Sequence, residues 1–176
     1  MQQSGYGLLL LFCGLICSTT AGAVNNHAHH PQADTDSAQH HNHHDADLRL
    51  NQGKKWETDK ALRDGMKNIR SATDNAMRSA HASPDHHLDK QQAKRLAEQV
   101  NQQVEHIFAE CKLSAEADAV LHGLLADMLQ ATQLLKHPGG SDRHSVQQVR
   151  LQALLSLQKS LALYPQYFND SEWHTD

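Results

Sequence analysis

The sequence predicts an all-α protein: an antiparallel up-and-down four-helix bundle preceded by a disordered histidine-rich arm. Only 5% of the 176 residues are aromatic, whereas Leu, Ala, Gln and Val are plentiful, which favours helices around an aliphatic core. Apolar residues also recur at spacings of three and four along four segments, the period of one helix face. The connections between these segments are short, so consecutive helices should pack antiparallel.

The first two helices are expected on either side of a proline-containing loop. The first should cover residues 58–80, with Thr58 as its N-cap residue. Pro84 interrupts the pattern, and the second helix should follow it and end near Cys111. Their apolar stripes are Leu62, Met66, Ile69, Thr73, Ala76 and Ala80, and then Leu96, Val100, Val104, Ile107 and Cys111.

The third and fourth helices follow with equally clear boundaries. Ser114 should cap the third helix, which the Pro138-Gly139-Gly140 turn ends. Asp142 or Ser141 should cap the fourth, and we expect Pro165 to end it after Tyr164. The two stripes are Ala117, Leu121, Leu124, Met128, Ala131 and Leu135, and then Val146, Val149, Ala153, Leu154, Leu157 and Leu161.

Large aromatic side chains are predicted to gather where the first helix begins and the fourth finishes. They are Trp56, Tyr164, Phe168 and Trp173. A cradle for a ligand is one interpretation, but large rings at the end of a bundle more often pack against each other and close the core.

The amino-terminal segment, residues 1–23, is typical of a secretory signal peptide. An apolar run extends from Gly7 to Cys17, and Ala21-Gly22-Ala23 supplies the small residues that signal peptidase prefers. This run is shorter than the roughly 20 residues that cross a bilayer. We therefore expect export to the periplasm without stable membrane insertion; lipid anchoring is less favoured, because bulky residues precede the cysteines of this segment.

Residues 24–53 lack hydrophobic periodicity and predict a disordered arm. The arm contains seven of the 15 histidines, with four aspartates among them. Imidazole nitrogen suits Cu²⁺, Zn²⁺ and Ni²⁺, so the arm indicates metal capture. The alternative is a solvated low-complexity tail with no selected partner. The seven residues are His27, His29, His30, His40, His41, His43 and His44.

Met66, His106 and His122 are the candidate metal ligands within the bundle. At a rise of about 1.5 Å per residue, the three lie at similar heights along their helices. A thioether with two imidazoles would favour Cu(I) over Zn²⁺. Asp118 precedes His122 by four residues, the spacing at which a carboxylate can orient an imidazole ring. The alternative is that both histidines are boundary residues with hydrogen-bonded rings.

Several functional classes have no support in the sequence. A formal net charge of -4 provides no basic surface for nucleic acid. The chain has no Cys-x-x-Cys-His motif for covalent haem, no paired Glu-x-x-His motifs on its stripes, no nucleophilic triad and no phosphate-binding loop. We therefore expect no enzymatic activity and no obligatory cofactor.

Two groups of motifs carry a resemblance to a known family. Lys55-Trp56-Glu57-Thr58-Asp59 is followed by Leu62-Arg63-Asp64-Gly65-Met66 and Ile69-Arg70. Later, Cys111-Lys112-Leu113 is followed by Ala117-Asp118, Leu121-His122 and a Leu-x-x-Tyr-Pro motif at 161–165. Over residues 56–170 the chain resembles the small, exported, histidine-tailed bacterial proteins labelled DnrO-like. The resemblance implies an exported helical bundle with Met66, Cys111 and His122 at motif positions, and it implies no settled biochemical role.

These observations predict an exported protein that captures or buffers copper or a similar divalent metal in the periplasm. The expected segments are a signal peptide (1–23), the arm (24–53), the bundle (54–170) and a short tail (171–176). One alternative is a cell-envelope module that binds a protein partner and has no metal role. Another is noncovalent binding of haem or an apolar ligand within the bundle.

Overall fold

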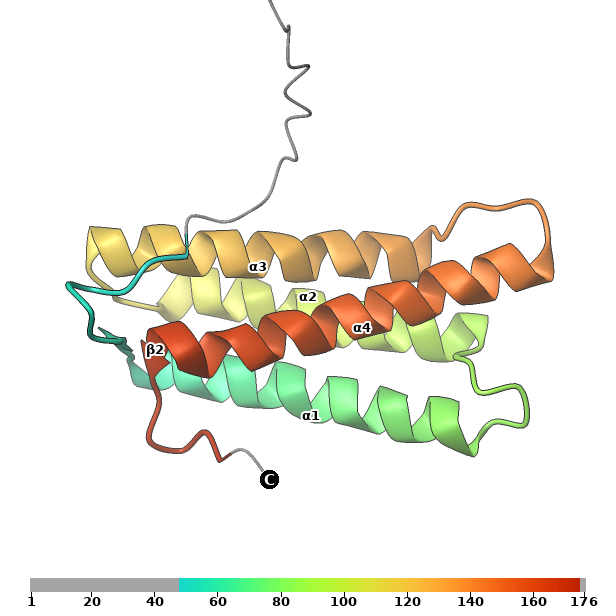
Figure 1. Ribbon diagram of the computed structural model, residues 1–176, viewed down its shortest axis with the longest axis horizontal. Helices are drawn as coiled ribbons and strands as arrows, with labels where there is room; N and C mark the ends of the chain where they lie inside the picture. The colour runs from blue at the N-terminus through green and yellow to red at the C-terminus, as the bar shows by residue number, and fades with distance from the viewer. Residues whose placement is uncertain (1–47, 175–176) are drawn as a thin grey trace, which may run out of the picture. The chain divides into compact units, whose positions relative to one another are not determined.

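The computed structural model describes residues 48–174 and confirms the antiparallel four-helix bundle. Over these residues the helices are α1 (Lys60–Ala82), α2 (Lys90–Glu110), α3 (Ala115–Lys136) and α4 (Arg143–Tyr167). Each helix packs against the next, and α4 returns to pack against α1 (Figure 1). No helix in the described range is both long and apolar enough to cross a membrane. The expected signal peptide (1–23) and the part of the arm that contains its seven histidines lie outside the described residues.

Each helix begins at a side chain that accepts a hydrogen bond from a backbone N–H three residues later. Ser114 caps α3, as the sequence predicts, and of the two candidates for α4, Ser141 and Asp142, the cap is Asp142. Asp89 caps α2. The expectation that Thr58 caps α1 is wrong by one residue. Asp59 is the cap, because its carboxylate accepts the Leu62 N–H at 2.8 Å, whereas the Thr58 hydroxyl donates to the carbonyl of Asn169.

Pro165 does not end the fourth helix, and this expectation is also wrong. It lies inside α4, which continues to Tyr167. Proline removes one N–H donor but keeps a helical φ, so a single proline in a last turn leaves little of the helix unsatisfied. The helical spacing also brings Tyr164 and Phe168 into a stacked pair with ring centroids 5.4 Å apart. This aromatic packing favours the helical course past the proline.

The buried side chains form one aliphatic core to which all four helices contribute. The predicted stripes supply most of it, including Met66, Ile107 and Leu154, each 0% exposed. Val146 and Val149, at the start of α4, are only half-buried. The aliphatic core and the helical class therefore follow from the sequence pattern, because a stripe of this kind must be removed from water.

A short pair of strands closes one end of the bundle and was not predicted. β1 (Trp56–Glu57) runs parallel to β2 (Phe168–Asn169), with Trp56 opposite Phe168. Trp56, Tyr164 and Phe168 are buried there, and Trp173 meets Tyr164 edge-on, with ring centroids 4.8 Å apart. The predicted aromatic cluster is therefore confirmed.

The folded region also starts before residue 54, the expected end of the arm. The indole nitrogen of Trp56 donates to the carbonyl of Arg49 at 2.7 Å. Leu48, one residue earlier, packs against the core. Burying an indole requires a partner for its N–H, which explains why these preceding residues fold onto the bundle.

Gly65 of α1 lies at a close contact between α1 and α2. A Cβ atom at this position would lie 2.5 Å from Cγ1 and 2.7 Å from Cδ1 of Ile107. Glycine therefore allows α1 and α2 to approach closely around a fully buried isoleucine.

We expect Gly65→Ala to lower the free energy of unfolding by about 1 kcal/mol. Overpacking a core costs about 1–3 kcal/mol, which exceeds the gain of roughly 1 kcal/mol from replacing a helical glycine with alanine. Urea unfolding followed by circular dichroism measures the difference. Ile107→Ala is the control background, in which the same substitution should no longer destabilise the bundle; a full cost in that background would show that Ile107 is not the cause.

Candidate functional site

The bundle does not bring the three predicted ligands together. Met66 is 0% exposed in the core, whereas His106 and His122 are both exposed. His106 lines a shallow hollow beside Asp64 and Asn68 of α1, and His122 lines a different hollow, between α2 and α3. The expectation that both imidazoles could reach the interior is wrong. Ile107 and Leu121 occupy the core-facing positions, so the neighbouring histidines turn by about 100° toward solvent.

A metal centre ready to receive an ion is also not formed elsewhere in residues 48–174. No three side chains among the histidines, cysteine, aspartates and glutamates of this range are close enough to share an ion. The helical faces therefore do not carry the predicted bundle site at Met66, His106 and His122.

His122 takes part in a local arrangement on the surface of α3. Its Nδ1 atom lies 2.9 Å from the backbone oxygen of Asp118 and 3.2 Å from a carboxylate oxygen of the same residue. The ring also stacks on Phe108 of α2, with centroids 5.0 Å apart. Asp118 therefore orients the imidazole, as the spacing of four residues predicts, and His122 fits the interpretation of a hydrogen-bonded boundary histidine.

The hollow beside His122 has a volume of about 590 Å³. Phe108, Leu113, Asp118 and His122 line it, together with Cys111 at the start of the α2–α3 turn. The Phe108 side chain is 47% exposed. The hollow combines an aromatic ring with one carboxylate and is open to solvent, so its chemistry suits contact with a partner side chain more than enclosure of a small molecule.

Asp59 ties the start of α1 to the α2–α3 turn and was not identified as important from the sequence. One carboxylate oxygen accepts the Leu62 N–H, and the other accepts the Lys112 N–H at 2.6 Å. The Cys111 thiol donates to the first oxygen at 3.5 Å. Burial raises the pKa of Asp59, but these hydrogen bonds and the nearby Arg63 outweigh it, and the pKa lies below its usual value.

Cys111 is consequently a poor nucleophile. Burial first, and then the negative charge and hydrogen bond of Asp59, raise the pKa of the thiol to about 12. With this pKa the cysteine stays protonated near neutral pH. It reacts slowly there, because the thiolate is the reactive form. Cys111, at the apolar edge of α2, thus has a structural role at the α2–α3 turn.

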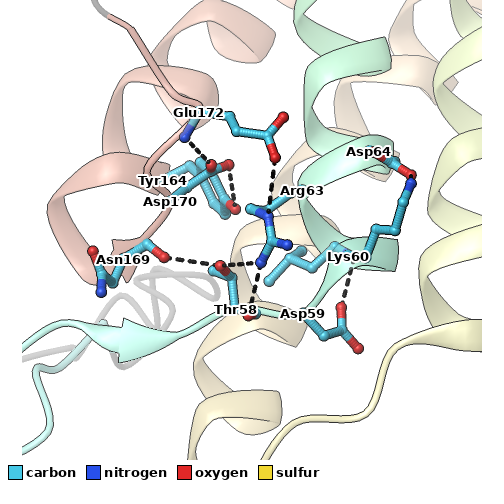
Figure 2. Close-up of polar contacts among 10 residues, drawn as sticks. Thr58, Asp59, Lys60, Arg63, Asp64, Tyr164, Asn169, Asp170 and Glu172 are labelled. Carbon is cyan, nitrogen blue, oxygen red and sulfur yellow. Dashed lines mark hydrogen bonds and ion pairs between the residues drawn. The ribbon is translucent and has the colours of Figure 1, made fainter.

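A polar network connects the same end of α1 to the carboxy-terminal residues (Figure 2). Nη1 of Arg63 donates to the carbonyl of Thr58 at 3.0 Å, and Nε lies 3.7 Å from Glu172. The Tyr164 hydroxyl donates to Asp170 at 3.1 Å, and the Glu172 N–H caps the same carboxylate. These contacts hold the segment after α4 against α1. The contact between Arg63 and Glu172 joins residues 109 positions apart, a separation at which helical periodicity carries no signal.

Comparison of the chain with protein family models, with curated proteins and with solved structures finds no match. The resemblance to DnrO-like proteins therefore stays a prediction that rests on its motifs.

We expect Asp59→Asn to make Cys111 markedly more reactive. Asparagine is also a good N-cap, so the substitution can retain the start of α1 while it removes the charge that raises the pKa of the thiol. Alkylation by iodoacetamide at pH 9, followed by mass spectrometry of the Cys111 peptide, should be at least about fivefold faster. Asp118→Asn is the control: Asp118 acts on the thiol at longer range, so a larger effect there than at Asp59 would contradict this account.

Proposed function

We propose that this protein is an exported metal-binding protein, in which the histidine-rich arm captures copper or a similar divalent ion and the bundle is its folded carrier. The observation that carries the proposal is the density of imidazoles in the arm, with seven histidines between residues 27 and 44. Four aspartates in the same arm add carboxylates. This ligand set suits Cu²⁺, Zn²⁺ and Ni²⁺.

Capture by such an arm requires no preformed cavity. Each imidazole binds weakly by itself, but neighbouring histidines on one chain raise the effective concentration of the next ligand. The arm would therefore collect ions at many overlapping sites and release them readily. This mechanism suits buffering, and the export signal predicted at 1–23 would place the buffering in the periplasm.

The aliphatic interior of the bundle supports the carrier role. Leucine, isoleucine, valine and alanine side chains make up most of the core, and the one methionine predicted as a ligand is enclosed among them. The bundle in this proposal supplies a stable folded body from which the arm extends.

A second candidate function is binding of a protein partner in the cell envelope. Phe108 on α2 and Leu151 and Leu155 on α4 are large apolar side chains that are 42–49% exposed. Single exposed apolar residues are ordinary on soluble proteins, but Leu151 and Leu155 lie on the same flank of one helix. Recovery of one partner in pull-downs with and without a chelator, lost on Leu155→Ser, would favour this function.

Calorimetric titration of Cu²⁺ and Zn²⁺ into the full chain tests the metal proposal. A variant with the seven arm histidines replaced by asparagine should bind with about tenfold or more lower affinity, because the multivalent ligands are gone. The matched control replaces three exposed histidines outside the arm, His106, His122 and His174, with glutamine and should bind as the parent does. Binding no tighter than about 1 mM in the parent, or about -4 kcal/mol, would contradict the proposal.

A further inference from the structure

Five histidines from two separate segments of the sequence lie at one end of the bundle. The antiparallel order places the α1–α2 and α3–α4 connections at the same end (Figure 1). Of the eight histidines within residues 48–174, five lie in or directly beside these two connections: His81, His86, His87, His137 and His144. We call this group the histidine end. The sequence already shows His81, His86 and His87 as a small group of exposed candidate ligands in one loop, and the structure adds His137 and His144 from the other connection.

His87 is the anchored member of the histidine end. Its side chain is 15% exposed, and Nε2 lies 2.9 Å from the amide nitrogen of Gln147, which donates to it. The other ring nitrogen, Nδ1, is enclosed and has no hydrogen-bond partner. The closest charged group to Nδ1 is a carboxylate oxygen of Asp85 at 3.9 Å. An enclosed ring nitrogen without a partner destabilises the loop, so its persistence calls for another role.

We propose that the histidine end is a second metal site, in which Nδ1 of His87 and the carboxylate of Asp85 bind one divalent transition ion. Metal–nitrogen and metal–oxygen bonds of about 2.1 Å at a tetrahedral angle place the two donor atoms about 3.4 Å apart. The observed separation is 3.9 Å, so the carboxylate would close by roughly 0.5 Å. The Asp85 side chain is 65% exposed and is free to make this movement.

Binding through Nδ1 leaves the imidazole neutral. The proton on Nδ1 moves to Nε2 through solvent, and the Gln147 amide turns over so that its oxygen accepts the new Nε2–H. The hydrogen bond between the two side chains is kept with its direction reversed. Gln147 then orients the ring as outer partners of metal-bound histidines do, which fixes the tautomer that exposes a lone pair on Nδ1.

We assign the third ligand to His144, which would have to move toward His87, because no three of these side chains are close enough to share an ion in this structure. His144 precedes Gln147 by three residues on the first turn of α4, so both side chains lie on one side of that helix. His86 is adjacent to His87 and holds a left-handed φ of 51°, a conformation that few residues other than glycine adopt without strain. Strain of this kind concentrates at functional loops.

The donor atoms also define the class of ion. Imidazole nitrogen with a carboxylate suits Cu²⁺, Zn²⁺ or Ni²⁺ rather than Cu(I), which prefers sulfur. Charges in the two connections and their flanks (82–90 and 136–143) balance, so the field there does not repel a cation. They are Asp85, Asp89 and Asp142 against Lys90, Lys136 and Arg143. The inference rests on the proposed metal function for the identity of the ion, but its ligands are separate from the arm.

Nuclear magnetic resonance of the full chain, with ¹³C-labelled histidine rings, tests the site during a Zn²⁺ titration. The ring signals of His87 and His144 should shift and saturate together, and Asp85→Asn should weaken this response by about tenfold or more. His87→Gln should abolish the saturating shift at His144. His106→Gln is the matched control, an exposed bundle histidine on α2 outside the histidine end, and it should leave the response unchanged.

The arm and the histidine end report separately in this experiment. Shifts of arm signals with no change at His87 would overturn the second site and leave the proposed function standing. A response at His87 without one in the arm would support the second site and contradict capture by the arm. No response at His87 up to about 1 mM Zn²⁺ overturns this inference, whatever the arm does.

Discussion

Burial of four apolar stripes in one aliphatic core is the constraint on which the rest of this structure depends. A helix with one apolar stripe is stable only when another surface covers that stripe, and short connections leave the neighbouring helix as the partner. The same packing determines where polar residues can act. Met66 is enclosed because it continues the stripe of α1. His106 and His122 are exposed because they lie beside the stripes of α2 and α3. The helix faces hence supply stability, and both of the proposed metal sites lie away from them, in the arm and at one end of the bundle.

The two ends of the bundle are built differently. At one, a half-buried carboxylate gathers donors: Asp59 accepts from the first turn of α1 and from the α2–α3 turn, and its charge adds to burial in keeping the Cys111 thiol protonated. Aromatic rings and a two-residue strand pair complete this end. At the other end, the connections are rich in histidine, and His87 keeps a ring nitrogen without a partner. A fully hydrogen-bonded network stabilises a fold. An unsatisfied polar atom in a loop is a candidate contact for a ligand, because loops carry many binding residues.

Metal binding in the arm and at the histidine end would differ in kind. Many equivalent imidazoles on one segment give capacity and fast exchange, because each ion holds few ligands at a time. A ring oriented by Gln147 and paired with Asp85 would give a defined geometry and slower release. The two would suit collection and retention of the same ion. Neither uses the exposed apolar side chains of Phe108 on α2 or of Leu151 and Leu155 on α4.

Periodicity was enough to establish the helical class and the aliphatic core, and capping residues located the starts of α3 at Ser114 and of α4 at Asp142 or Ser141, since these features depend on residues close together in the chain. Helix rotation decided the rest. A shift of one position turns a side chain by about 100°, which separates His106 and His122 from the core although both neighbour its stripes. Three contacts join residues between 50 and 112 positions apart: the hydrogen bond from Lys112 to Asp59, the strand pair, and the hydrogen bond between Gln147 and His87. Only the packed bundle brings such residues together, because local sequence patterns carry no information about contacts across that distance.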